Sequence, residues 1–403
     1  RFRMPYYLRL ASWCLAALRA DALRVGSSAG LSASGVFADG LLGEAGELAE
    51  ALDVADAPLT GSLDATTRPA VKDEDIDAWL HMSHGDAKYL FMYQPILRTM
   101  QEGLQRLGAA TRIVIKLADK AMVKGVRLAT AKGRRPLVMT VALQWADNST
   151  YEAIEECRRA GAYLVLYSPE PNDVPRVSAL AERIGAREVW ELSLHNALRY
   201  TSDFQQRVTV RFLPSGYSRK LDVGVGLDDP NRDEGKVGFL GRWSGRPQSV
   251  QNLYAGMFGS SFVSTYGSWN LANLDSFVRR YPLQLNVHQV ESCCPRDPTA
   301  HVVMEAFRMT LLLSNKACVV STPVPDDEMP PWEGLVHFAE ANETSAVIER
   351  LRKDVRGCQE HSARLYKERF DPVRLIKNSG FLSVWQPRNV TALHAALRSI
   401  EVA

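Results

Sequence analysis

Short apolar runs alternate with amphipathic stretches along most of the chain, and this alternation predicts strands and helices in turn. The clearest strand patterns are the runs at 137–143 and 163–167, which are of the apolar kind found in buried strands of parallel sheets. Helical periodicity follows each of them, at 151–159 and at 174–184. Repeated strand–helix units of this kind predict parallel sheets.

The pattern forms two series, joined by a connection at 214–233 that is rich in Gly, Pro, Asp and Arg. The first series begins near residue 90, and its expected helices and strands are 95–107, 112–117, 137–143, 151–159, 163–167, 174–184, 188–192, 195–200 and 208–213. The expected elements of the second series are 236–240, 247–258, 285–288, 298–313, 317–321, 344–356 and 360–369. We therefore expect an α/β fold with two doubly wound, Rossmann-like parallel-sheet domains.

Length and composition agree with two packed domains. A chain of 403 residues exceeds one ordinary core, and its 46% hydrophobic and 23% charged residues are close to the globular average. We expect an N-terminal extension at 1–77, a first domain at 78–214, a second domain at 215–380 and a C-terminal helix at 381–403.

The charge balance restricts the class of partner. The chain has 48 basic and 46 acidic side chains, a net charge of +2, so we expect no general nucleic-acid or membrane-surface binding. The best apolar run, 10–18, is too short to span a bilayer, and no transmembrane segment is expected. Residues 1–38 carry five arginines and one acid, which fits an organellar transit peptide or a basic amphipathic helix. The localisation stays open between an organelle and, by default, the cytoplasm.

Cysteine and histidine spacing gives no metal motif. The six cysteines form no CxxC pair and no visible disulfide framework. Cys318 lies in an apolar strand and is expected to be a buried thiol, while the adjacent Cys293 and Cys294 are interpreted as incidental. His81 and His84 have a spacing that would suit metal ligands, but no third ligand is evident, and we expect no metal site.

Polar residues gather in the stretch 285–322, where a strand ending at His288 leads through a loop into a helix. Asp297 and Pro298 fit the start of that helix as N-cap and first helical residue. The free backbone N–H groups of Thr299–His301 would point out of a sheet edge. A helix start in this position suits a diphosphate.

Two further clusters in the second half carry charge. Glu305 and Arg308 lie one turn apart on the expected helix and make either a surface ion pair or a nucleotide site. In the second case Glu305 would accept hydrogen bonds from the two ribose hydroxyls, with Arg308 orienting it. The segment 236–247 runs from a strand into a loop with Gly241 and Arg246, which suits a phosphate group although it is neither GxGxxG nor a P-loop.

The first half offers candidate groups for catalysis. Glu170 follows the strand at 163–167 and is the best-placed carboxylate for a catalytic base, with Asp173 behind it. Ser193, His195 and Asn196 lie in the next strand-to-helix turn and would line the same cleft.

The order of these blocks resembles GT-B glycosyltransferases, and in particular the glycosyltransferase family 1-like group that includes bacterial spore-coat-maturation proteins. The blocks that resemble the C-terminal half are LPSGYS (213–218), VGFLGRWSGRP (237–247), LNVH (285–288), MEAFRMTLLLSNKACVVST (304–322) and HFAEANETSAVIERL (337–351). The first half contributes AGAYLVLYSPEP (160–171) and VWELSLHNALRY (189–200). The similarity covers residues 135–375, and the order of the blocks carries it, since no single motif matches in full.

The resemblance implies a GT-B arrangement with a cleft between the two domains. It also implies that a sugar moves from a nucleotide-diphosphate sugar to an acceptor of unknown identity, without a metal or another cofactor. The donor contacts that it implies come from Gly241, Arg246, His288, Glu305 and Arg308.

Two positions depart from the family pattern. Ser314 and Asn315 stand where a glycine commonly precedes the last strand, and Asn315 can supply a left-handed helix cap instead. Thr322 occupies a position that is often acidic, so the resemblance does not specify the sugar. These departures keep open a GT-B-shaped binding or assembly protein without transferase activity. Another doubly wound enzyme, such as an epimerase, is also open because fold does not settle function.

Overall fold

The computed structural model describes residues 72–84, 87–141, 143–169, 174–203, 208–265, 271–288 and 302–387. The expected N-terminal extension therefore lies almost entirely outside the described residues, as do most of the expected C-terminal helix and three candidate site residues, Glu170, Asp173 and Thr299. Within the described part of the chain, no helix combines the length and the apolar character needed to cross a membrane.

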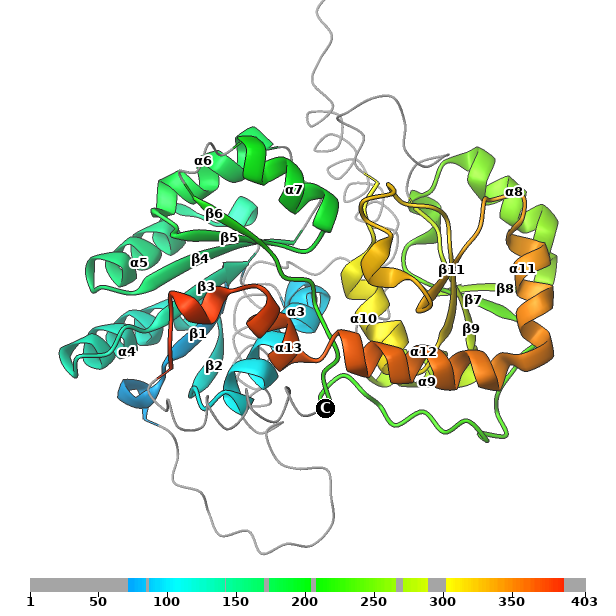
Figure 1. Ribbon diagram of the computed structural model, residues 1–403, viewed down its shortest axis with the longest axis horizontal. Coiled ribbons are helices and arrows are strands. Elements are labelled where there is room, and N and C mark those ends of the chain that lie inside the picture. The colour runs from blue at the N-terminus through cyan, green and yellow to red at the C-terminus, as the bar shows by residue number, and fades with distance from the viewer. Residues whose placement is uncertain are drawn as a thin grey trace, which may run out of the picture. The chain divides into compact units, whose positions relative to one another are not determined.

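The first half forms a six-stranded parallel sheet with the order β2-β1-β3-β4-β5-β6 (Figure 1). Its strands are β1 (Ala78–Met82), β2 (Thr111–Ile115), β3 (Leu137–Val141), β4 (Tyr163–Ser168), β5 (Glu188–Glu191) and β6 (Thr209–Phe212). The helices that connect them are α3 (Ala87–Arg106), α4 (Asp119–Ala131), α5 (Asn148–Arg159), α6 (Val174–Ile184) and α7 (Leu194–Asp203). Every residue of β1, β3 and β4 is buried, as expected for strands covered on both faces.

The second half forms a five-stranded parallel sheet with the order β11-β10-β9-β7-β8. Its strands are β7 (Val237–Leu240), β8 (Phe262–Thr265), β9 (Leu283–Asn286), β10 (Cys318–Ser321) and β11 (Val336–Phe338). The helices are α8 (Gln248–Phe258), α9 (Leu271–Arg280), α10 (Ala306–Ser314), α11 (Thr344–Leu351), α12 (Val355–Arg369) and α13 (Pro372–Asn378). The two parallel sheets confirm the predicted fold class of two doubly wound α/β domains.

Both sheets reverse their strand order beside their first strand. In the first sheet the chain runs from β1 out to β2 and returns past β1 to β3, and in the second it runs from β7 to β8 and back to β9. Ligands of open α/β sheets bind outside the carboxyl ends of the strands at such switch points. In the second sheet this position lies at the ends of β7 and β9.

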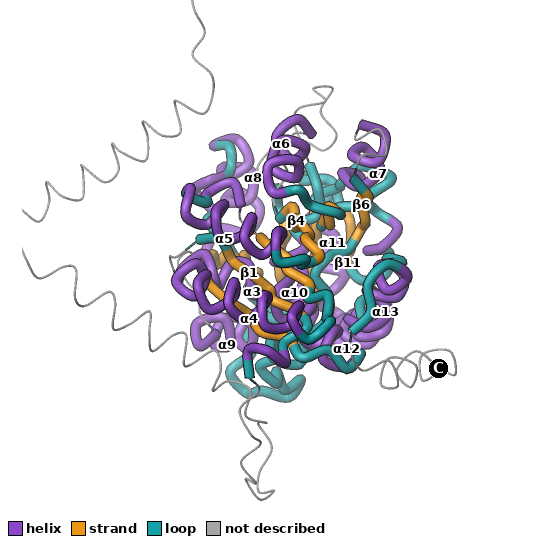
Figure 2. Tube along the Cα trace, turned by 90° about the vertical axis from the view of Figure 1, so that its left-hand side faces the viewer, coloured by secondary structure: helices purple, strands orange, loops and turns teal. Residues whose placement is uncertain are grey.

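Each sheet has its own apolar core, and the strands lie among the helices that cover them (Figure 2). In the first sheet, Trp79 on β1 packs against α4 so closely that a Cβ added at Gly125 would lie 2.2 Å from the indole ring. In the second sheet, Phe239 on β7 packs in one cluster with Tyr254 on α8 and Ile348 on α11. Each sheet is therefore stabilised by packing against its own helices.

The chain after α12 returns to the first half of the protein. Asp371 accepts a hydrogen bond of 2.6 Å from Arg106 at the end of α3, and α13 packs along that helix. The ring of Phe381 lies 4.8 Å from that of Trp190 on β5, centroid to centroid, and the indole of Trp385 donates a 2.9 Å hydrogen bond to the carbonyl of Arg135. The predicted division at residue 380 falls inside this returning segment.

The sequence prediction is wrong at the start of two helices. Helix α3 begins at Ala87, before the predicted start at 95, and accommodates Pro95 inside it. Helix α10 begins at Ala306, whereas the sequence predicted one helix over 298–313. Residues 302–305 are not helical, and the first three of them are buried apolar residues. The two valines among them disfavour a helix modestly, and tertiary packing decides between the alternatives.

Candidate functional site

Arg246 joins the carboxyl ends of β7 and β9. It lies in the loop after β7, and its side chain is 2% exposed. Its Nε and Nη2 donate hydrogen bonds of 3.0 and 2.7 Å to the carbonyl of Val287, just beyond β9. Nη2 also donates to a carboxylate oxygen of Glu305 at 3.1 Å. The planar fork of the guanidinium group thus fixes the strand ends and the acid together.

Arg308 holds the other carboxylate oxygen of Glu305. It lies in the first turn of α10, is 6% exposed, and forms an ion pair with Glu305 Oε2. Its Nη1 donates a 2.7 Å hydrogen bond to Asn286 Oδ1 at the end of β9. The guanidinium carbons of Arg308 and Arg246 lie 4.8 and 4.7 Å from the ring centroid of Phe239. Cation–π attraction to this ring helps to keep two like charges in one place.

The electrostatics of this Arg246–Glu305–Arg308 cluster leave it cationic. Burial raises the pKa of Glu305, but the charges of Arg308 and Arg246 outweigh it and hold that pKa below its usual value. Burial lowers the pKa of Arg246 to about 10, so the group stays protonated at neutral pH. Burial also lowers the pKa of His288 to about 4, so its ring is neutral. Two guanidinium ions and one carboxylate leave a net charge of about +1.

Gly241 allows the backbone to approach the cluster. Its φ is +146°, a conformation that favours glycine, and an added Cβ would lie 3.0 Å from Nη2 of Arg308. The structure thus brings together all five residues for which the family resemblance implies donor contacts.

Thr322 positions His288, which lies two residues beyond the end of β9. The backbone N–H of His288 donates to the Thr322 hydroxyl at 3.3 Å, and its Nε2 lies 3.2 Å from the Thr322 carbonyl. The residue that departs from the family pattern therefore takes part in the same cluster.

Asn315, the other departure, does not have the left-handed conformation that the sequence suggested. Its φ is −104°, and Lys316 adopts the positive φ of 57°. The Asn315 amide instead donates to the carbonyls of Leu221 and Leu311, and its oxygen accepts from the N–H of Val223. These bonds fix the connection between the two halves to the end of α10. They hold Asn315 in place, and the next residue, Lys316, takes the left-handed conformation.

Ser193 and Asn196 lie at the start of α7 and surround two buried carboxyl groups that the sequence analysis did not identify. The Ser193 N–H donates to Glu191 at 3.2 Å, and its hydroxyl donates to Glu328 at 2.9 Å. The N–H of His195 also donates to Glu328 at 2.9 Å. Glu191 lies inside an apolar strand pattern and Glu328 inside an acidic run, so neither stood out as a site residue.

Burial raises the pKa of both carboxyl groups, that of Glu191 to about 8 and that of Glu328 to about 7. The charge of Glu328 raises the pKa of Glu191 further, and Asp327 does the same to Glu328. The pair therefore holds protons near neutral pH.

This Glu191–Glu328 pair reaches the cationic cluster through Met304. Glu328 accepts a backbone hydrogen bond from Met304, the residue before Glu305. The Met304 sulfur in turn accepts from Nδ2 of Asn286 at 3.5 Å. The turn that carries Ser193 in the first half is thus connected to the segment that carries Glu305 in the second half.

Two other predictions concern residues away from this cluster. The ring of His81 is buried between Thr140 and Asp119, at 3.0 and 2.9 Å, in a structural hydrogen-bond chain. Cys318 is not a free thiol as expected, because it forms a disulfide with Cys358 on α12. The two cysteines are 40 positions apart in the sequence, and this spacing gives no signal from which the bond could be predicted.

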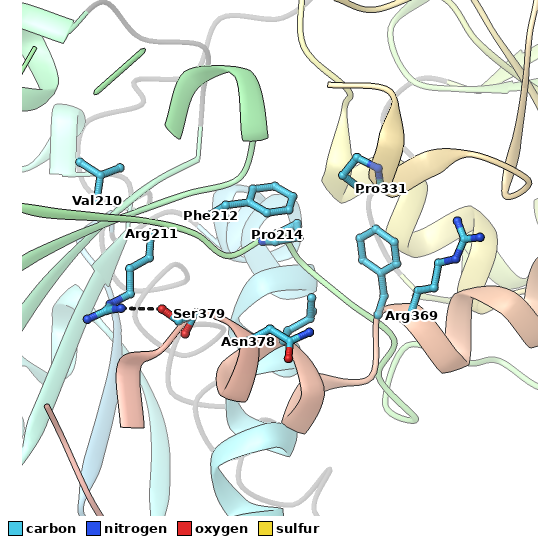
Figure 3. A pocket seen from close by; sticks show the side chains of 10 residues that line it. Val210, Arg211, Phe212, Pro214, Pro331, Arg369, Asn378 and Ser379 are labelled. Atoms are coloured by element: carbon cyan, nitrogen blue, oxygen red, sulfur yellow. Dashed lines mark hydrogen bonds between the residues drawn. The ribbon is translucent and has the colours of Figure 1, made fainter. Parts of the chain in front are cut away.

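A cavity of about 410 Å³ lies between β6, α13 and the end of α12 (Figure 3). None of the predicted site residues lines it. Its two arginines are engaged: Arg211 binds Glu188 and the Ser379 carbonyl, and Arg369 donates to the Glu333 carbonyl. The cavity borders β6, the edge strand of the first sheet, and not the switch point of either sheet, so we assign the candidate site to the Arg246–Glu305–Arg308 cluster.

No family model and no curated protein matches the chain. Several solved structures match it in fold, and three of them follow. Sucrose-phosphate synthase from Thermosynechococcus elongatus is 12% identical, with a TM-score of 0.46, over 76% of this chain and 98% of that one. T4 phage BGT, solved in complex with its UDP-glucose substrate, is 9% identical, with a TM-score of 0.41, over 76% and 98%. The Glycosylation Associate Protein (Gap123) complex from Streptococcus agalactiae is 10% identical, with a TM-score of 0.41, over 65% of this chain and 57% of that chain.

Proposed function

We propose that this protein transfers a sugar from a nucleotide-diphosphate sugar to an acceptor, and that the donor binds at the Arg246–Glu305–Arg308 cluster. The observation that supports the proposal is the place and charge of this cluster. It combines two buried guanidinium groups and one carboxylate that is 30% exposed, at the switch point of the second sheet. An α/β sheet is expected to bind its ligand at that point.

Each member of the cluster has a role in this proposal. Glu305, the more exposed member, accepts hydrogen bonds from the ribose hydroxyls. Arg246 and Arg308 face the diphosphate, and the excess positive charge favours it. Nε of Arg308 is buried and has no hydrogen-bond partner among the described residues. When the bond from the sugar to the diphosphate breaks, the leaving diphosphate gains charge and the guanidinium groups stabilise it.

The acceptor side of the reaction is assigned to the first half. Glu170 is proposed as the base that takes the proton from the acceptor hydroxyl as the new glycosidic bond forms. Ser193 and Asn196 belong to the adjacent turn. Since Glu191 and Glu328 already bind Ser193, its role in this proposal is to position the turn.

A binding or assembly protein of the same fold is the second candidate. It is favoured by the complete burial of Ser193 and Asn196, which leaves neither side chain exposed to an acceptor. Such a protein would bind a nucleoside diphosphate without releasing it from a nucleotide sugar.

Turnover of the donor tests the first candidate without knowledge of the acceptor. The full chain is incubated with UDP-, GDP- and ADP-linked sugars. Water then serves as the acceptor of the sugar, and the nucleoside diphosphate that is released is measured. We expect release from one nucleotide class, and we expect Glu305→Ala to lower it at least tenfold. Glu349→Ala, which removes an acid that is 61% exposed on α11, is the control and should leave the rate unchanged. Nucleotide binding without release would support the binding protein, and neither binding nor release would overturn both.

A further inference from the structure

Three residues with metal-binding side chains meet in the second sheet, away from the cationic cluster. Cys318 is the first residue of β10, at the opposite end of that strand from Thr322. His337 lies in the neighbouring strand β11, and Cys358 lies on α12. The two sulfur atoms and a ring nitrogen all lie within 4.8 Å of one another. None of these residues has a role in the proposed sugar transfer.

The distances are close to those of a zinc site. Bonds of about 2.3 Å to sulfur and about 2.0 Å to nitrogen place neighbouring ligand atoms of a tetrahedral zinc ion about 3.5–3.8 Å apart. Sγ of Cys358 lies 3.4 Å from Nε2 of His337, which already approaches this separation. The two sulfur atoms are bonded in the structure, and the Cα atoms of Cys318 and Cys358 are 5.7 Å apart. Rotation of the cysteine side chains after reduction can separate the sulfurs without a large movement of the backbone.

The surroundings can accept a metal ion in place of the disulfide. Cys318 is buried, whereas His337 and Cys358 are half-buried, so an ion can enter from the side of α12 and keep a water molecule as its fourth ligand. A structural disulfide in a core does not require an imidazole beside its sulfur. Two thiolates and one imidazole form a ligand set that selects zinc over magnesium or calcium.

We propose that the reduced chain binds one Zn²⁺ through the thiolates of Cys318 and Cys358 and Nε2 of His337. A dithiol reductant supplies two electrons and two protons to the disulfide and is itself oxidised to a disulfide. Zn²⁺ then displaces the two thiol protons and links α12 to β10 and β11. The disulfide and the metal use the same sulfur atoms, so each excludes the other. The site therefore exchanges one cross-link for another when the redox conditions change.

Cobalt titration of the full chain tests this proposal directly. The chain is reduced with a phosphine, freed of metal, and titrated with Co²⁺ while the thiolate-to-cobalt charge-transfer absorption is recorded. We expect a saturable band at one equivalent, which Zn²⁺ abolishes, and no such band in the oxidised chain. Cys157→Ser, which removes a buried free cysteine of α5, is the control and should titrate like the wild type.

The variants at the site identify the ligands. Cys318→Ser/Cys358→Ser should lose the band although Cys14, Cys157, Cys293 and Cys294 remain. His337→Ala keeps both thiols and should bind Co²⁺ at least tenfold more weakly. If circular dichroism shows that the double variant is unfolded, His337→Ala alone tests whether the three residues bind the metal. No band in the reduced wild type, or a band of full strength and affinity in His337→Ala, would overturn the proposal. Neither outcome depends on the turnover of a nucleotide sugar.

Discussion

Glu305 is held by two guanidinium groups, while Gly241 leaves room for one of them. An added Cβ at Gly241 would lie 3.0 Å from Nη2 of Arg308 and would require a strained positive φ. A side chain at this position therefore acts on both the stability of the loop and the position of the arginine.

We expect Gly241→Ala to destabilise the fold by about 1–3 kcal/mol and to weaken nucleotide binding several-fold. Gly224→Ala is a matched control, because Gly224 also has a positive φ but an added Cβ there meets nothing within 4 Å. Urea unfolding and isothermal titration measure the two effects. If both variants bound nucleotide equally well, the space that Gly241 leaves beside Arg308 would have no role in the site.

The buried Glu191–Glu328 pair predicts a pH dependence of stability. The ordinary pKa of both carboxyl groups, about 4.5, applies in the unfolded chain, whereas in the folded chain the pKa is about 8 for Glu191 and about 7 for Glu328. Between these values the unfolded chain loses protons that the folded chain keeps, so the free energy of unfolding falls as pH rises from about 5 to 8.

Glu191→Gln should make this fall smaller, because an amide does not ionise. Urea unfolding at several pH values between 5 and 8 measures it, with Glu349→Gln as the exposed control. Each unit of pKa difference corresponds to about 1.4 kcal/mol. An identical pH dependence in the wild type and in Glu191→Gln would contradict the raised pKa of this group.

At the scale of elements, the segment 372–387 belongs by packing to the first sheet. Phe381 is fully buried, lies 4.8 Å from the ring of Trp190, and stacks on Trp385 at 5.3 Å. We expect Phe381→Ala to destabilise the protein by about 3–5 kcal/mol, as for other large buried aromatic residues. Val384→Ala, at a position that is 44% exposed, should cost less than 1 kcal/mol. Chemical unfolding of the full chain compares them, and similar values for the two variants would contradict this packing.

The elements that were predicted correctly from the sequence are those whose local pattern of apolar and polar residues determines their structure. The strands β3 and β4 are mostly apolar and fully buried, and α6 was predicted with its observed bounds because its periodicity is regular. Strand β1 was missed because it contains His81, whose polar ring is satisfied by Asp119 and Thr140 from distant parts of the chain. The start of α10 was misplaced because tertiary burial of residues 302–304 outweighs local helix signals.

The candidate site was predicted in its second half more completely than in its first. Charged residues near strand ends identified Arg246, Glu305 and Arg308, and the structure joins them by ion pairs. Glu191 and Glu328 were missed because their raised pKa values come from burial and from neighbouring carboxylates, which the local sequence does not show. The disulfide of Cys318 was missed for a similar reason, since its partner lies on another element.

At the scale of the whole chain, two parallel sheets share one topological plan. Each has a switch point, and the cationic cluster occupies that of the second sheet. Ser193 of the first half is connected through Glu328 to Met304, next to Glu305. A ligand that orders Glu305 is therefore expected to affect the contact of Glu328 with the first half as well.

Isothermal titration of the full chain with UDP, GDP and ADP tests the central claim most directly. We expect one of these diphosphates to bind, and its affinity to fall at least tenfold in Glu305→Ala but not in Glu349→Ala. Binding that Glu305→Ala leaves unchanged, or no binding of any of the three, would contradict the assignment of a nucleotide-sugar site to the Arg246–Glu305–Arg308 cluster.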